Sequence, residues 1–196
     1  MVESVAARMP PEDPYDATGE ADLPAPAFRP GDAESFRRAW RGIGSTVTLI
    51  ATEHRAVRHA MLATAVSSVS MEPPSLLVCV NHSASSHAAL CERGAFSLGI
   101  IGSSQRDLAA AIAEAPSAQR FTHGTWRRIR ASGEAIDGLP WLEEARTTLF
   151  CAIDARLDYG THSILVARIA NATEAREADP LIYCDGSYGR FASPAA

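Results

Sequence analysis

The amino-acid sequence predicts a mainly β protein, an antiparallel β-barrel with helices packed against its outside. Six or seven short segments are apolar or β-branched and are typical of strands, while two or three others have helical periodicity. The two kinds of segment do not alternate strictly, as they would in a parallel α/β fold. The chain has 196 residues, of which 46% are hydrophobic, so it is long enough to bury one core.

The N-terminal segment differs in composition from the rest of the chain. Six of the 12 prolines fall within the first thirty residues, which show little apolar periodicity. Such a segment cannot repay the entropy of ordering it. We therefore expect a flexible leader over residues 1–31 and a folded domain over residues 32–192.

The first half of the domain begins with an expected helix over 33–41. Phe36 and Trp40 fall four residues apart on one face, Asp32 can cap the helix, and Gly42 can end it. The expected features that follow are a strand at 45–52, a charged turn at 53–59, an alternating segment of small residues at 63–70, and a buried strand at 75–80.

The second half predicts two helices, and Ser104 is the expected cap of the second. Its apolar residues keep to one stripe. The strands expected there are short, and the one at 148–157 alternates best between apolar and polar positions. The helices are expected at 86–93 and 104–114, and the strands at 96–101, 148–157, 163–169 and 181–184.

Several classes of function are disfavoured by composition and by missing motifs. A net charge of -5 argues against nucleic-acid binding, and no apolar run reaches the roughly 20 residues of a membrane helix. The first thirty residues lack the apolar middle of a secretory signal, so we expect a cytoplasmic protein. The four cysteines form no C-x-x-C pair, and the six histidines are not spaced with carboxylates as metal ligands would be, so no metal site is expected. The dinucleotide fingerprint, the P-loop and the usual hydrolase motifs are missing.

Three segments could carry chemistry. The turn at 81–87 is rich in hydroxyl groups and leads into a helix, where an anion such as phosphate is favoured, although serines there can equally serve as ordinary caps. The small residues at 63–70 could let a flat ring approach the backbone, or could simply pack tightly. A glycine turn at 160–162 presents His162, which could be functional or merely structural.

Taken together and in this order, these segments resemble the short-chain flavin reductase family, whose fold is the split β-barrel that binds flavin mononucleotide. The strongest element is S-V-S-x-x-P-P, followed by an apolar strand and the N-x-S-x-S-S-H turn. The Gly-Thr-His form at 160–162 resembles the reductase components of 4-hydroxyphenylacetate 3-monooxygenase and of similar two-component flavin monooxygenases. The matching stretches are GSTVTLIAT (44–52), LATAVSSVSMEPPSLLVCVNHSASSH (62–87), GAFSLGII (94–101), GTHSILVARI (160–169) and PLIYCDGSYGRF (180–191).

The resemblance implies a set of site residues. Those lining the flavin ring would be Ala63, Thr64, Ala65, Val66 and Ser67. Those holding the ribityl chain and phosphate would be Asn81, Ser83, Ser85 and Ser86. Those shaping the nicotinamide side would be His162, Tyr188 and Arg190. The sequence departs from the family pattern at Ala60, Leu62 and Gly99, and each departure loses a possible polar contact with flavin.

The function implied by the resemblance is NAD(P)H:flavin oxidoreduction, with FMN or FAD and NADH or NADPH. The reduced flavin would pass to a separate flavin-dependent monooxygenase, and the chain would form a homodimer. Two alternatives remain open at this point. One is an enzyme that keeps its flavin and acts on another substrate, and the other is a non-catalytic flavin-binding module on the same barrel. The proline-rich leader could contact the oxygenase or have no role.

Overall fold

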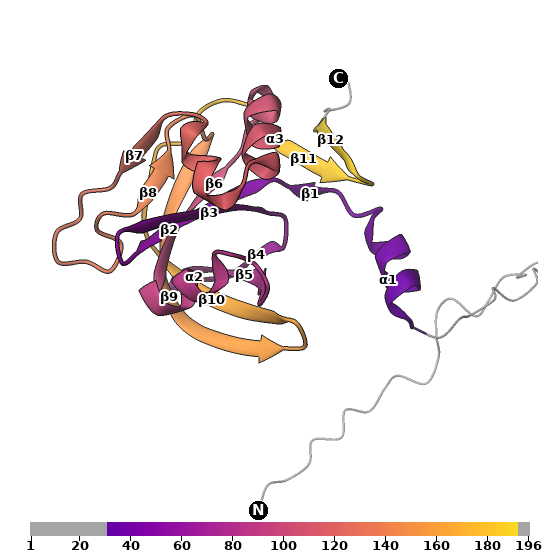
Figure 1. Cartoon of the computed structure of the whole chain (residues 1–196), viewed down its shortest axis with the longest axis horizontal. Helices are drawn as coiled ribbons and strands as arrows, with labels where there is room; N and C mark the ends of the chain where they lie inside the picture. Colours follow the sequence, from indigo (N-terminus) through magenta and orange to yellow (C-terminus); the bar gives the residue numbers. More distant parts are fainter. Residues whose placement is uncertain (1–30, 192–196) are drawn as a thin grey trace, which may run out of the picture.

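The structure, a computed structural model, describes residues 31–191 (Figure 1). The leader expected over residues 1–31 therefore lies almost entirely outside the described residues, as does residue 192 of the expected domain. Of the helices that the structure describes, none is long and apolar enough to cross a membrane.

Strands dominate the described part of the chain, and the helices are short. The helices are α1 (Ala33–Trp40), α2 (His87–Arg93) and α3 (Arg106–Glu114), with 3-10 turns η1 (Ser103–Gln105) and η2 (Ser117–Thr122). The strands of the first half are β1 (Ser45–Thr46), β2 (Thr48–His54), β3 (Val57–Ala63), β4 (Val66–Met71), β5 (Pro74–Asn81) and β6 (Ala95–Ile100). Those of the second half are β7 (Trp126–Arg128), β8 (Pro140–Leu142), β9 (Thr147–Tyr159), β10 (His162–Ala172), β11 (Leu181–Cys184) and β12 (Ser187–Arg190).

The main sheet has seven antiparallel strands in the order β3-β2-β6-β9-β10-β5-β4. Its two edge strands, β3 and β4, are joined by only Thr64 and Ala65. In a flat sheet these edges would lie about 29 Å apart, because neighbouring strands are spaced about 4.8 Å from each other. A two-residue link spans only about 11 Å. The sheet must therefore curl until its edges come within reach of this link, which confirms the predicted antiparallel barrel with flanking helices.

The core lies in two main parts. Inside the curled sheet, Val78, Phe96 and Leu165 are fully buried. On the outside, Val47, Ile112 and Leu181 pack together beneath α3. Burial of apolar side chains on both faces of the central strands explains why these strands are almost uniformly hydrophobic.

A small second sheet attaches the C-terminal strands to the barrel. It has the order β1-β11-β12. The amide of Val47 donates to the carbonyl of Leu181 at 2.8 Å, and the amide of Leu181 donates to the carbonyl of Ile101, also at 2.8 Å. These bonds bring β11 and β12 beside α3, at the end of the barrel from which α1 extends (Figure 1).

The prediction of a charged turn over residues 53–59 is wrong. In its place β2 runs to His54 and β3 starts at Val57, so that only Arg55 and Ala56 form the turn. Both have positive φ, 50° and 61°, as a two-residue hairpin turn requires. Such turns usually contain asparagine or glycine, and neither residue is present here, so nothing in the residues indicates this hairpin or strand β3.

The other expected helices and strands are confirmed, with shifts at their ends. Asp32 caps α1, since its side chain accepts a hydrogen bond from the amide of Ser35 at 2.7 Å. Ser104 does not cap α3. It lies inside η1, and the helix begins at Arg106. Three short strands were not expected: β7, β8 and β12.

Candidate functional site

Two neighbouring cavities lie on the outside of the barrel, beside α3. One, which we call the hydroxyl cavity, has a volume of about 270 Å³ and is lined by Met61, Leu62, Ala84, Ser85, Ser86, Ala113 and Arg120. The other, which we call the tyrosine cavity, has a volume of about 210 Å³ and is lined by Val47, Leu62, Ala63, Thr64, Ala113, Tyr183 and Tyr188. Leu62 and Ala113 belong to both linings, so the two cavities adjoin.

The turn that supplies the hydroxyl cavity is shaped by Asn81. Its Oδ1 accepts hydrogen bonds from the amide and the hydroxyl of Ser83, both at 2.8 Å. Ser86 is the N-cap residue of α2, yet its side chain makes no capping bond. The capping interpretation of these serines therefore does not hold, and the hydroxyls of Ser85 and Ser86 are available at the cavity.

Arg120 supplies the positive charge of the hydroxyl cavity, and sequence reasoning missed it. Its guanidinium donates to the carbonyl of Ala60 at 2.6 Å and to that of Ala115 at 3.2 Å, which fixes the side chain. The helix that follows the serine turn has only seven residues, so its dipole is a weaker source of attraction for an anion than a full charge. No motif in the sequence distinguishes Arg120 from the paired surface residues Arg127 and Arg128.

The tyrosine cavity combines small side chains with two aromatic rings. Tyr183 and Tyr188 meet edge to face, with ring centroids 5.4 Å apart. Burial, followed by the neighbouring Tyr183, raises the pKa of Tyr188, so its phenol stays protonated at neutral pH and can donate a hydrogen bond. Ala63 and Thr64 leave room for a flat group beside these rings.

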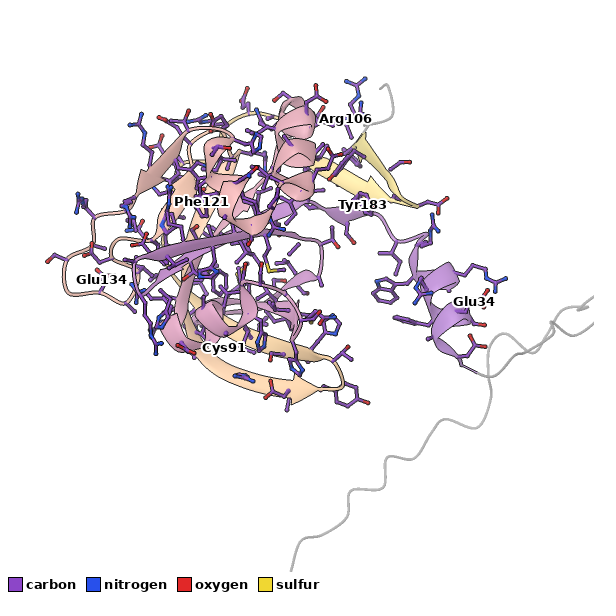
Figure 2. All side chains as sticks on the ribbon, in the orientation of Figure 1. Glu34, Cys91, Arg106, Phe121, Glu134 and Tyr183 are labelled. Carbon is purple, nitrogen blue, oxygen red and sulfur yellow. The ribbon has the colours of Figure 1, made fainter. Side chains whose placement is uncertain are left out.

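Two larger hollows continue from the tyrosine cavity. One of about 390 Å³ includes Phe36, Trp40, Thr64 and Tyr183 in its lining. In Figure 2, Tyr183 lies on β11, in the stretch between the barrel and α1. The other, of about 330 Å³, is lined by Ser103, Ser104, Arg106, Leu181, Tyr188, Gly189 and Arg190.

The structure brings only part of the predicted site together. Ala63, Thr64, Ser85, Ser86, Tyr188 and Arg190 line these four hollows. Ala65, Val66, Ser67, Asn81, Ser83 and His162 do not line them. The carbonyl of Ala65 accepts a hydrogen bond from the amide of Cys79 on β5. His162 pairs across the sheet with Asn81, and its Nδ1 lies 2.9 Å from the hydroxyl of Thr161.

The three departures from the family pattern have distinct structural settings. Leu62 lines both the hydroxyl and the tyrosine cavities. Ala60 is fully buried and offers its carbonyl to Arg120. Gly99 has a packing role, because a Cβ atom there would lie 3.1 Å from the Cβ of Ala145.

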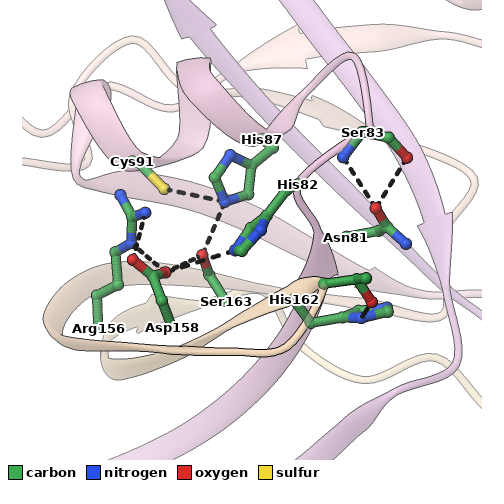
Figure 3. A network of polar contacts seen from close by, with 10 residues as sticks. Asn81, His82, Ser83, His87, Cys91, Arg156, Asp158, His162 and Ser163 are labelled. Carbon is green, nitrogen blue, oxygen red and sulfur yellow. Dashed lines mark hydrogen bonds and ion pairs between the residues drawn. The ribbon is translucent and has the colours of Figure 1, made fainter.

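A network of polar side chains lies beside the serine turn (Figure 3). Asp158 accepts two bonds of 2.8 Å from Arg156 and a further bond from the hydroxyl of Ser163. His87 Nε2 lies 2.8 Å from the same hydroxyl, and His82 Nε2 lies 3.6 Å from Asp158. Hydrogen bonds from Arg156 and Ser163 hold the pKa of Asp158 well below its usual range. Burial, followed by the charge of Arg156, lowers the pKa of His87.

The described residues thus combine a curled antiparallel barrel with two adjoining cavities, one lined by hydroxyls and an arginine and the other by small and aromatic side chains. This combination suits the class of protein that binds a phosphate-bearing aromatic cofactor. The model of the flavin reductase like domain matches residues 40–192. The chain belongs to this flavin reductase family, and its fold is the family's split barrel.

Curated relatives and solved structures agree with this assignment. The chain is 36% identical over 177 residues to an FMN reductase (NADH) of Pseudomonas syringae, covering 87% of this chain and 96% of that one. It is 34% identical to the reductase component of the FADH(2)-dependent resorcinol hydroxylase of a Rhizobium species, covering 84% of this chain and 90% of that one. The NADH:FAD oxidoreductase of Streptomyces globisporus, solved with NAD and FAD fragments, is 27% identical with a TM-score of 0.75, covering 88% and 100%.

The lowered pKa of His87 predicts that the folded chain loses stability in mild acid. Below about pH 6.5 the unfolded chain binds a proton at this position before the folded chain does, so the free energy of unfolding falls as the pH drops. Urea denaturation between about pH 7.5 and pH 5 measures this slope. His87→Gln, which keeps a side-chain N–H but does not titrate, should flatten it. Equal slopes in the two proteins would contradict the prediction.

Proposed function

We propose that this chain oxidises NADH, reduces FMN, and releases the reduced flavin to a separate flavin-dependent oxygenase. The observation that carries the proposal is the joined pair of cavities in a chain of the flavin reductase family. A phosphate fits the hydroxyls and guanidinium of one cavity, and an aromatic ring fits the small and aromatic walls of the other. Relatives named FMN reductase (NADH) support the choice of cofactors.

The donor set of the hydroxyl cavity fits a phosphate monoester. Ser85 and Ser86 provide hydroxyl donors, and Arg120 provides a charge that is already oriented by two backbone carbonyls. Asn81 and Ser83 hold the shape of this turn. A flavin phosphate held here would place the ribityl chain along Leu62, toward the tyrosine cavity.

The tyrosine cavity fits the ring end of the flavin. Ala63 and Thr64 line it with small side chains, and along the sequence they are followed by Ala65 and by Val66 and Ser67 at the start of β4. Tyr188, expected on the nicotinamide side, lies in the same cavity as Ala63 and Thr64 and can also donate to a polar edge of the flavin ring. Arg190 lies in the adjoining hollow. His162 remains a proposed residue of the nicotinamide side, carried over from the family motif.

When bound, the flavin accepts a hydride from the nicotinamide, and this chemistry belongs to the two cofactors. The chain's own residues bind and orient the two cofactors and exclude water from them. Hydride transfer needs no acid or base from these residues. This accounts for the lack of a catalytic dyad among the predicted site residues.

A partner flavoenzyme is expected because several relatives are components of two-protein systems. Besides the resorcinol hydroxylase reductase, the flavin reductase component of a bacterial two-component tryptophan halogenase is 30% identical, with a TM-score of 0.71, covering 83% of this chain and 99% of that one. An enzyme that hands its flavin to a second protein must release it readily, so we expect moderate flavin affinity.

The test of the function is NADH oxidation, followed by the loss of NADH absorbance, with and without added FMN. We expect oxidation that depends on free FMN and saturates with it. The same assay with FAD and NADPH gives the cofactor preference, and His162→Ala should lower turnover sharply if His162 positions the nicotinamide. Flavin binding without oxidation of either nucleotide would instead favour the binding module, and a tightly retained flavin would favour an enzyme with another substrate.

The Arg120 side chain gives a second prediction. Arg120→Met should weaken FMN binding by about tenfold, the usual size of a lost charge-assisted hydrogen bond, while riboflavin, which has no phosphate, binds as before. Fluorescence titration measures both affinities. Arg127→Met is the matched control, since Arg127 pairs with Glu143 away from the cavities. Equal losses for FMN and riboflavin would show that Arg120 does not contact phosphate.

We also propose that the chain forms a homodimer. The single chain leaves large apolar side chains in water, among them Met71, Leu157 and Tyr159, with 84%, 61% and 79% of their surface exposed. On α1, Phe36 and Trp40 stack with centroids 5.3 Å apart but remain mostly exposed, and the helix stands away from the barrel (Figure 1). Such surfaces are typical of protein interfaces.

The dimer proposal predicts that, at micromolar concentration, the protein sediments as a particle with the mass of two chains. The double variant Phe36→Glu and Trp40→Glu should shift the protein toward the monomer, because each substitution places a charge on the apolar face of α1. Glu34→Gln, on the same helix, is the control. A wild-type protein that sediments as a monomer at every concentration would rule out the homodimer.

A further inference from the structure

The polar network beside the serine turn connects three separate elements. Asp158 comes from β9, Ser163 from β10, and His87 is the first residue of α2. None of the three lines the four hollows described above. Ser163 is fully buried, so losing one of its hydrogen-bond partners would leave a buried polar group without that partner.

The direction of each hydrogen bond follows from the charges. Asp158 is ionised and can only accept, so the hydroxyl of Ser163 donates to it. The oxygen of Ser163 is then left to accept from His87 Nε2. The result is a one-way chain, from His87 to Ser163 to Asp158, which Arg156 completes from the other side. Hydrogen bonds linked in this way strengthen one another.

This chain of hydrogen bonds fixes the far end of the serine turn. At the near end, Asn81 is held by its pairing with His162, and the amide of His82 donates to the carbonyl of Thr161 at 2.9 Å. At the far end, His87 is held by Ser163. Ser85 and Ser86 lie between the two anchors, and both anchors belong to the same hairpin of β9 and β10.

We propose that the hydrogen-bonded chain His87–Ser163–Asp158 positions the turn 81–87 for recognition of the flavin phosphate. The proposal rests on the proposed function and adds positioning residues to it. His87 and Ser163 act through Ser85 and Ser86, without touching the flavin themselves. A phosphate binds only if its hydrogen-bond donors are held in a fixed arrangement, whereas the flavin ring needs only a flat apolar surface. The network should therefore affect the affinity for the phosphate and not the affinity for the ring.

The experiment compares binding of FMN with binding of riboflavin, by fluorescence titration of the full chain. Wild type should prefer FMN. Ser163→Ala and His87→Ala should each lower FMN affinity by about tenfold, with riboflavin affinity unchanged, since loss of a supporting hydrogen bond commonly costs a factor of this size. Ser163→Thr and His87→Gln, which keep the hydroxyl and an N–H donor, should recover most of the preference.

Ser97→Ala is the matched control. Ser97 is equally buried on a strand of the same sheet, and its hydroxyl donates to the carbonyl of Pro140 at 2.6 Å, away from the turn. It should lower the melting temperature as Ser163→Ala does, yet keep the FMN preference.

A Ser163→Ala protein with the wild-type preference, or with equal losses for the two ligands, would overturn the positioning role and leave the proposed function standing. Equal affinity of the wild-type protein for FMN and riboflavin would show that this turn does not recognise the phosphate, even if NADH oxidation persists. Failure of the wild type to bind flavin at all would overturn the proposed function, and the positioning role with it.

Discussion

The pairing of β5 with β10 is the constraint on which the site depends. Along this ladder the three fully buried residues of β10 each face a buried residue of β5: Ser163 opposite Val80, Leu165 opposite Val78, and Ala167 opposite Leu76. A slip of one residue would turn all of these side chains to the other face of the sheet, so burial locks the register. The same register places Asn81 opposite His162 at the end of the ladder. The serine turn and the glycine turn therefore meet because of packing deep in the barrel.

What the sequence could predict was local. The cap at Asp32, the alternation of β9 and the apolar run of β5 each depend on neighbouring residues, so the helices and most strands were found. The hairpin at Arg55 and Ala56 was not, because two residues that rarely adopt positive φ are held there by the strands they join. Four of the predicted ring and phosphate residues line cavities, since the motif that named them is contiguous.

What the sequence could not predict was long-range. Arg120 comes from a polar stretch without a motif and reaches the serine turn only through the packing of η2 on β3. That packing includes the guanidinium of Arg58, 4.4 Å from the ring centroid of Phe121. Likewise, Asp158 and His87 are far apart in the chain, and only the fold joins them through Ser163. The tight packing of Gly99 against Ala145 is also a property of the fold, whereas the loss of a polar flavin contact at this position stays a prediction.

The way Arg120 is anchored has a consequence for how a ligand approaches. Its fixed bonds go to neutral carbonyls, and among residues 31–191 no carboxylate forms an ion pair with it. No carboxylate of these residues therefore neutralises the guanidinium, and its conformation is already fixed by the two carbonyls. In a chain whose net charge is -5, this leaves a local positive charge in the lining of the hydroxyl cavity. Added salt screens charges that are more than about 8 Å apart at physiological ionic strength, so the attraction of this guanidinium for an anion would act only at short range, after the anion has reached the cavity.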